Sequence, residues 1–92
     1  MAETGAHIIV RGRVQGVGFR DFVAGEARAR SLTGTVRNLP DGGVEVDVEG
    51  SRNGIEDLIR RLQIGPPGSR VTDVATTWRS AAGKETRFSV AW

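Results

Sequence analysis

Two glycines and an arginine lie close together in residues 15–20, which read QGVGFR. The segment joins an apolar run to a stretch with helical periodicity, so Gly16 and Gly18 come just before a predicted helix start. Backbone N–H groups at a helix N-terminus lack partners within the helix, and glycine lets the chain bend so that several point at one anion. Arg20 would add a permanent charge and two parallel hydrogen bonds to a phosphate. This segment is therefore a candidate phosphate-binding loop.

A simpler interpretation of the same segment is that the glycines only form a tight turn and that Arg20 is a solvated surface residue. The residues alone favour this simpler interpretation. The segment is not a P-loop, because GxxxxGK is missing, and it does not match GxGxxG, because Asp21 stands at the third glycine position. Nucleotide binding therefore loses support.

Asn38 is a second candidate, just before the turn at residues 40–43 (PDGG). An amide takes no proton at neutral pH, but its carbonyl and NH₂ groups can hold a water molecule for attack. Asparagine side chains also commonly cap turns, and from the residues alone this second interpretation is preferred.

Other polar and aromatic residues are weaker candidates. His7 is the only histidine and has no evident carboxylate partner. The acids Glu45, Asp47 and Glu49 resemble a row of metal ligands. They alternate with three valines, however, and are expected to form the solvent-exposed face of a strand. Large aromatics on strands usually pack in the core or at an edge, and Trp78 and Trp92 are assigned no role. No metal site is predicted.

The hydrophobic periodicity predicts the elements that must position these residues. Helices are expected over residues 19–31 and over a second segment that Asn53 caps and Gly65 ends. Strands are expected at residues 8–14, 35–39, 44–49 and 71–79, with a short edge strand at 87–92. This order predicts an α+β, ferredoxin-like βαββαβ sandwich, in which two helices cover one face of an antiparallel sheet of four to five strands.

Length and composition limit the range of functions. The 92 residues predict a single domain over residues 1–92, with residues 1–6 as a loose N-terminus. The chain has no cysteine, which excludes disulfides, thiolate metal sites and a catalytic thiol, and fits a reducing compartment. No secretion signal or membrane-spanning stretch is present, so a cytoplasmic protein is expected. The thirteen basic and eleven acidic residues are scattered, which is weak evidence for polyanion binding.

Two longer motifs, GRVQGVGFR at residues 12–20 and GTVRNLPDGGVEVDVEG at residues 34–50, resemble the two-part signature of the acylphosphatase family. The resemblance continues in GPPGSRV at residues 65–71 and in Phe88, so it covers the chain from about residue 8 onward. It implies a ferredoxin-like hydrolase that cleaves carboxyl–phosphate anhydrides without metal or other cofactor. Arg20 and Asn38 would be the catalytic residues, with Asn38 holding the water. The phosphate-binding positions would be Gln15, Gly16, Val17, Gly18, Phe19 and Arg20.

The resemblance also implies the partners of the chain. These are a small-molecule acyl phosphate as substrate and inorganic phosphate or a similar anion in the loop, with no nucleic acid and no membrane, and the protein is expected to be a monomer. Two positions depart from the family pattern. Thr35 stands where relatives often carry a bulky aromatic, and Gly18 stands where vertebrate members have a larger residue. Neither departure touches the chemistry.

Two functions from other classes are alternatives. An RNA-binding module of the same architecture would need aromatic residues on its central strands, whereas residues 44–49 contain none and carry three acids. A regulatory domain that binds an anion without turnover would explain the loop and Arg20. It would not require a water-holding amide, so the presence of Asn38 favours catalysis.

Overall fold

The computed structural model describes residues 3–91, which form five strands and two helices. The first half contains β1 (Thr4–Arg13), α1 (Phe19–Ala29) and β2 (Thr33–Asn38). The second half contains β3 (Val44–Gly50), α2 (Arg52–Ile64), β4 (Arg70–Ser80) and β5 (Phe88–Val90). This is the predicted βαββαβ order with the additional short strand at the end.

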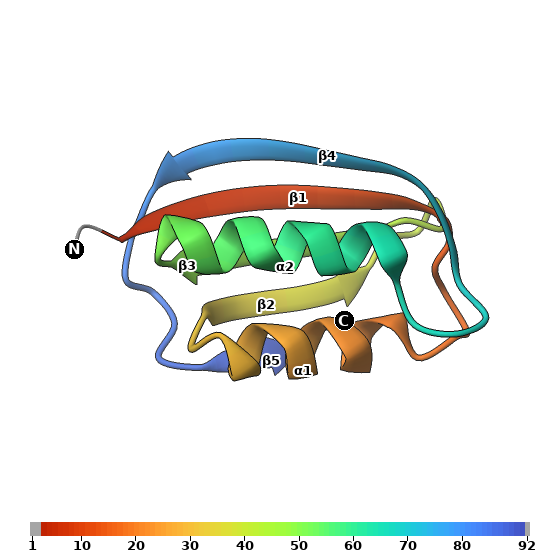
Figure 1. Cartoon of the computed structure of the whole chain (residues 1–92), viewed down its shortest axis with the longest axis horizontal. Coiled ribbons are helices and arrows are strands. Elements are labelled where there is room, and N and C mark those ends of the chain that lie inside the picture. The colour runs from red at the N-terminus through yellow and green to blue at the C-terminus, as the bar shows by residue number, and fades with distance from the viewer. Residues whose placement is uncertain (1–2, 92) are drawn as a thin grey trace.

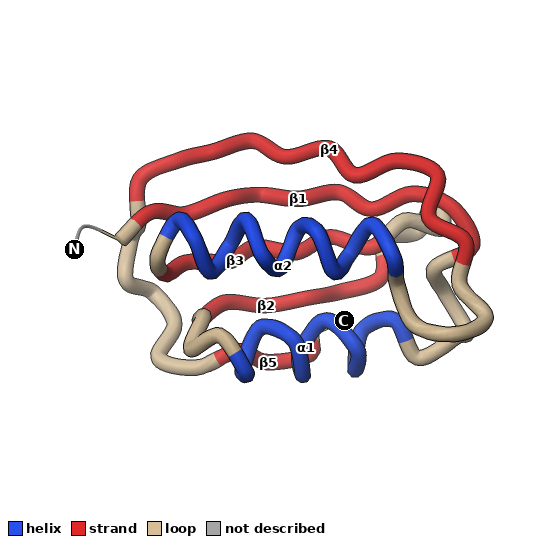
Figure 2. The backbone as a smooth tube through the Cα atoms, viewed as in Figure 1, coloured by secondary structure: helices blue, strands red, loops and turns tan. Residues whose placement is uncertain are grey.

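The strands form one sheet in the order β4-β1-β3-β2-β5, and both helices lie on the same face of it (Figure 1). Helix α2 lies over the half of the sheet that contains β1, and α1 lies over the half that contains β2 and β5 (Figure 2). The two connections β1–α1–β2 and β3–α2–β4 therefore place both helices in one layer. This arrangement confirms the predicted ferredoxin-like sandwich.

The core lies between the sheet and the helices and follows from the alternation of apolar residues. Val44, Val46 and Val48 of β3 are fully buried, as expected for the inner face of a central strand. Helix α2 adds a stripe of buried residues at helical spacing, and α1 does the same with a second stripe. The buried residues of the two helices are Phe19, Val23, Ala24, Ala27, Ile55, Leu58 and Leu62.

Strand β5 departs from the predicted antiparallel sheet, because it pairs with β2 in parallel. The other three strand pairs are antiparallel. Strand β4 ends where β1 begins, and the chain then crosses that end of the sheet to the opposite edge (Figure 1). A strand that starts from this end must run in the same direction as β1 and β2, so the parallel pairing follows from the path of residues 81–87.

Two predicted boundaries are corrected by the structure. Strand β1 begins at Thr4, because residues 4–6 pair with both β3 and β4 and Ala6 is fully buried. Residues 4–6 are therefore not part of a loose N-terminus, and residues 1–2 lie outside the described range. Helix α2 is capped by Ser51 and not by Asn53, since the Ser51 Oγ accepts a hydrogen bond from the Gly54 N–H at 3.1 Å. Asn53 lies inside the first turn.

The helix-free face of the sheet carries ion pairs where solvated acids were expected. His7 Nε2 lies 2.8 Å from Glu45 Oε2, so this histidine does have a carboxylate partner. The Arg79 guanidinium bonds both Asp47 and Glu49, at 2.7 and 2.5 Å. Glu49 is only 8% exposed. Strand pairing brings these residues together across the sheet, and that pairing was not visible in the period-two pattern of β3 alone.

Within residues 3–91, neither helix is long and apolar enough to cross a membrane.

Candidate active site

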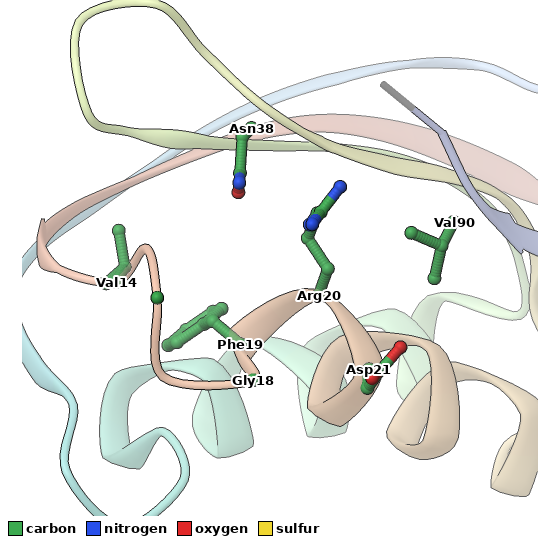
Figure 3. A pocket seen from close by; sticks show the side chains of 8 residues that line it. Val14, Gly18, Phe19, Arg20, Asp21, Asn38 and Val90 are labelled. Atoms are coloured by element: carbon green, nitrogen blue, oxygen red, sulfur yellow. The ribbon is translucent and has the colours of Figure 1, made fainter.

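A cavity of about 130 Å³ lies between the N-terminus of α1, the end of β2 and strand β5 (Figure 3). Antiparallel pairing of β2 with β3 brings the end of β2 to the same end of the sheet as the end of β1, where α1 begins. The cavity is therefore built from segments that lie far apart in the sequence. The residues that line it are Val14, Gly16, Gly18, Phe19, Arg20, Asp21, Asn38 and Val90.

The loop between β1 and α1 depends on two glycines in left-handed conformations. Gly16 has φ of 73° and Gly18 has φ of 75°, a region in which a side chain is strained. A Cβ at either position would meet nothing within 4 Å, so glycine is required there by the backbone conformation and not by space.

Helix α1 starts with free N–H groups. Its N-cap is Gly18, which has no side chain to accept a hydrogen bond, and the first intrahelical bond runs from the Phe22 N–H to the Gly18 carbonyl at 3.0 Å. The N–H groups of Phe19 and Arg20 precede that bond and have no helical partner. The helix dipole adds partial positive charge at the same place, so the geometry suits an anion.

Arg20 extends from the first turn of α1 into the cavity (Figure 3). Its guanidinium makes no hydrogen bond or ion pair with any other residue of the described range 3–91. Arg28, also on α1, instead donates two bonds to the Phe88 carbonyl and has a structural role. The charge of Arg20 is thus available to a ligand that enters the cavity.

Asn38 reaches the same space from the last residue of β2 (Figure 3). Its Oδ1 atom is buried and accepts no hydrogen bond from residues 3–91. The turn that Asn38 was expected to cap is held by Asp41, whose carboxylate accepts a bond from the Gly43 N–H at 3.0 Å. This bond, with Arg11 as a further partner, lowers the pKa of Asp41. The capping interpretation of Asn38 therefore has no support.

Four of the six predicted phosphate-binding residues line the cavity, namely Gly16, Gly18, Phe19 and Arg20. Gln15 and Val17 do not. The Gln15 side chain instead donates to the carbonyls of Leu39 and Gly43, at 2.8 and 2.9 Å, and ties the loop to the β2–β3 turn. Val17 packs against the hydrophobic core.

Three lining residues were not singled out from the sequence: Val14, Asp21 and Val90. Val14 and Asp21 flank the predicted loop and could have been included by proximity. Val90 reaches the cavity only because β5 pairs with β2 in parallel, and a pattern within residues 87–92 carries no signal of that pairing.

The weaker candidates that lie within residues 3–91 do not line this cavity. Trp78 is partly buried against the core, and the guanidinium carbon of Arg52 lies 4.0 Å from the centroid of its ring. Trp92 lies outside the described residues. No group of three or more His, Asp or Glu residues within the range 3–91 is arranged to hold a metal ion.

Comparison with known proteins gives a consistent answer. The sequence model of the family described as Acylphosphatase matches residues 6–90. An acylphosphatase of Chlorobaculum tepidum is 57% identical over 74 residues, which are 80% of each chain. The crystal structure of acylphosphatase from Bacillus subtilis superposes with a TM-score of 0.94 at 43% identity, covering 97% of this chain and 99% of that one. An acylphosphatase structure from Coxiella burnetii gives 0.92 at 38% identity, with 98% and 94% covered.

Proposed function

The chain belongs to the acylphosphatase family, and from this premise we propose that the 15–20 loop and Arg20 hold the phosphoryl group while Asn38 holds the attacking water. The protein is a hydrolase that cleaves the carboxyl–phosphate bond of an acyl phosphate. Water adds to phosphorus, the bond between phosphorus and the carboxylate oxygen breaks, and the products are a carboxylate and inorganic phosphate. The observation that carries the proposed roles is the buried Oδ1 of Asn38, which lies in the same cavity as Arg20, while neither group has a hydrogen-bond partner within residues 3–91.

The phosphoryl group suits the start of α1. In phosphoryl transfer, negative charge spreads over the three equatorial oxygens of the transferred group. Free N–H groups at the helix start and the Arg20 guanidinium are already in place, so they stabilise this charge without reorganising during the reaction. Because these groups supply positive charge themselves, we propose that hydrolysis needs no metal ion.

The attacking water suits Asn38. The Oδ1 atom accepts a hydrogen bond from the water and orients a lone pair of the water oxygen toward phosphorus. An amide does not take the proton, so the proton passes to a phosphoryl oxygen of the substrate or to solvent. The carboxylate is a good leaving group and needs no general acid. Positioning and charge are therefore the two contributions that this site makes.

Arg20, Asn38 and the start of α1 meet within a single chain, and we propose on this ground that the monomer is the active form.

Hydrolysis of benzoyl phosphate in the presence of EDTA tests the proposal. The parent protein is expected to turn over, and Arg20→Lys is expected to lower kcat/KM by at least about 10²-fold, because a lysine cannot form the two parallel bonds. Arg13→Lys is the matched control, since Arg13 is exposed and forms no ion pair within residues 3–91, and it should retain parental activity. Activity that disappears with EDTA would reject metal independence. A folded parent that is inactive on several acyl phosphates would support an anion-binding domain without turnover.

A further inference from the structure

The turn at residues 65–69 (GPPGS) joins α2 to β4 and lies next to the 15–20 loop, called the phosphate loop below, with Gly65 near Phe19 and Gly68 near Val17. Its residues do not line the cavity. They belong to a sequence motif that the proposed chemistry leaves unexplained.

Gly65 lies directly against the first residue of α1. A Cβ built at Gly65 would lie 3.1 Å from Cε2 of Phe19 and 2.3 Å from Oγ of Ser69. The Phe19 ring is 1% exposed, and Phe19 lines the cavity. Gly65 also has φ of 71°, so both space and backbone conformation require glycine there. A side chain at residue 65 would therefore push on the Phe19 ring and on the Ser69 hydroxyl.

The turn is itself fixed at both ends. The Gly65 N–H donates to the Arg61 carbonyl at 2.9 Å, which ties the turn to the last turn of α2. Ser69 closes the turn, because its Oγ and its N–H both donate to the Pro66 carbonyl, at 2.6 and 3.1 Å. At Gly68, a Cβ would lie 3.9 Å from Cγ1 of Val17, so this end of the turn is next to the middle of the phosphate loop.

The phosphate loop needs such external support. Gly16 and Gly18 have no side chains, and a Cβ built at either position would meet nothing within 4 Å. Glycine also loses more conformational freedom on ordering than any other residue. The side chains that anchor this loop are Gln15, which bonds the β2–β3 turn, Phe19, which lies in the core, and Val17, which packs against the core. The two core anchors are those next to the 65–69 turn.

We propose that the Gly65–Ser69 turn is a positioning element for phosphate binding. It holds Phe19 and Val17 in place and so keeps the N–H groups of the loop and the start of α1 aimed at one point. The proposal rests on the proposed function, because it assumes that the phosphoryl group binds at this loop. Its residues act through Phe19 and Val17 and do not touch the substrate.

Gly65→Ala tests the proposal, with Gly83→Ala as a matched control. Gly83 has φ of 69°, nearly that of Gly65, but a Cβ there meets nothing within 4 Å. Both substitutions place a side chain on a residue with positive φ, and only the one at residue 65 pushes on Phe19 and Ser69. The measured quantities are the inhibition constant of inorganic phosphate, kcat and KM for benzoyl phosphate, and the free energy of unfolding in urea.

Both variants are expected to lose stability. Only Gly65→Ala should raise the inhibition constant of phosphate, by at least about tenfold, because small displacements of a binding group are costly. A folded Gly65→Ala with a phosphate inhibition constant within twofold of the parent would overturn the proposal. Equal weakening of phosphate binding in Gly83→Ala would overturn it too, since strain alone would then suffice.

Ser69→Ala keeps the proposal testable if Gly65→Ala does not fold. It removes only the Oγ bond to the Pro66 carbonyl and should weaken phosphate binding about two- to fivefold, because the turn loosens while its backbone bond remains. An unchanged inhibition constant of phosphate in this variant would contradict the positioning role of the turn. A parent that binds no phosphate would reject the proposed function itself. A parent that binds phosphate, with variants that bind it equally well, would reject only the positioning role of the turn.

Discussion

The guanidinium of Arg20 and the Oδ1 atom of Asn38 face one cavity from opposite layers of the fold, and neither is hydrogen-bonded to another group within residues 3–91 (Figure 3). A buried acceptor without a donor costs about 1–3 kcal/mol of folding free energy. Such a group is rare in a folded protein, and it persists where a ligand or water completes it. The pair therefore has the character of a site prepared for a charged ligand and a water molecule.

Asn38→Ala should separate activity from stability. Loss of the water-holding amide is expected to lower kcat about 10²-fold, the cost of one misplaced or missing catalytic contact. The free energy of unfolding should stay the same or rise, because the substitution removes a buried acceptor that has no partner. Urea unfolding and benzoyl phosphate hydrolysis measure the two effects. Asn53→Ala on the exposed side of α2 is the control, and it should leave kcat unchanged. A large loss of stability in Asn38→Ala would mean that the amide has a structural role.

Gln15 offers a graded test of the link between the loop and the β2–β3 turn. Gln15→Ala removes two donated bonds to carbonyls and should cost about 1–2 kcal/mol and raise KM. Gln15→Glu should be worse than alanine, because a carboxylate cannot donate to the Leu39 and Gly43 carbonyls and adds negative charge near the phosphate. Steady-state kinetics give the order, with Gln63→Glu on the exposed surface of α2 as the charge control. A glutamate variant as active as the parent would contradict the bracing role.

Ser31 follows the end of α1 with φ of 58°, the one positive value at a residue other than glycine within residues 3–91. The Ser31 N–H donates to the Arg28 carbonyl and the Leu32 N–H to the Ala27 carbonyl, which is the pattern of a helix end that favours glycine. Ser31→Gly should therefore stabilise the protein by about 0.5–1 kcal/mol without changing kcat. Thermal or urea unfolding checks this. Ser80→Gly, where φ is not positive, should destabilise instead, and the same sign at both positions would refute the explanation.

The fold was predictable wherever the spacing of apolar residues determined which face of an element is buried. The alternation of β3 and the stripes of both helices predict the core, because each element buries one side against the other layer. The direction of β5 was not predictable, because a strand of three residues takes its direction from the loop that leads to it. The burial of Glu49 was missed for a related reason, since a period-two pattern identifies a face but not what later covers it.

The sequence indicated which segments contribute to the candidate site, but not which side chains form hydrogen bonds there. The glycine spacing and Arg20 made residues 15–20 a candidate, although the residues alone favoured a simple turn, and four of these six residues line the cavity. The sequence alone favoured Asn38 as a turn cap, and only the position of Asp41 in the folded turn removes that alternative. The side chain of Gln15 was expected at the phosphate, but it bonds the neighbouring turn, because its amide meets two carbonyls that strand pairing brings there.

Glu49 anchors the connection that carries β5 across the end of the sheet. Its two oxygens accept bonds from the Ala82 and Gly83 N–H groups at 2.7 and 2.9 Å, and Arg79 donates to the same carboxylate. These partners favour the charged form, and the bond from Ala82, followed by those from Arg79 and Gly83, lowers the pKa of Glu49 to about 2 from 4.5. The segment that Glu49 anchors leads to Val90 at the cavity.

Stability should therefore fall with acid in a range that Glu49 helps to set. A carboxyl whose pKa is lower in the folded state stabilises the protein fully above pH 4.5, and this contribution disappears as the pH falls toward 2, where the folded state also takes the proton. Glu49→Gln should be less stable than the parent at pH 7, and the difference in free energy of unfolding between the two should shrink between pH 4.5 and pH 2.

Urea unfolding at several pH values measures that difference. Glu85→Gln on the same segment controls for loss of charge alone, because Glu85 forms no ion pair within residues 3–91. A difference that stays constant with pH would show that Glu49 acts through packing and not through its charge.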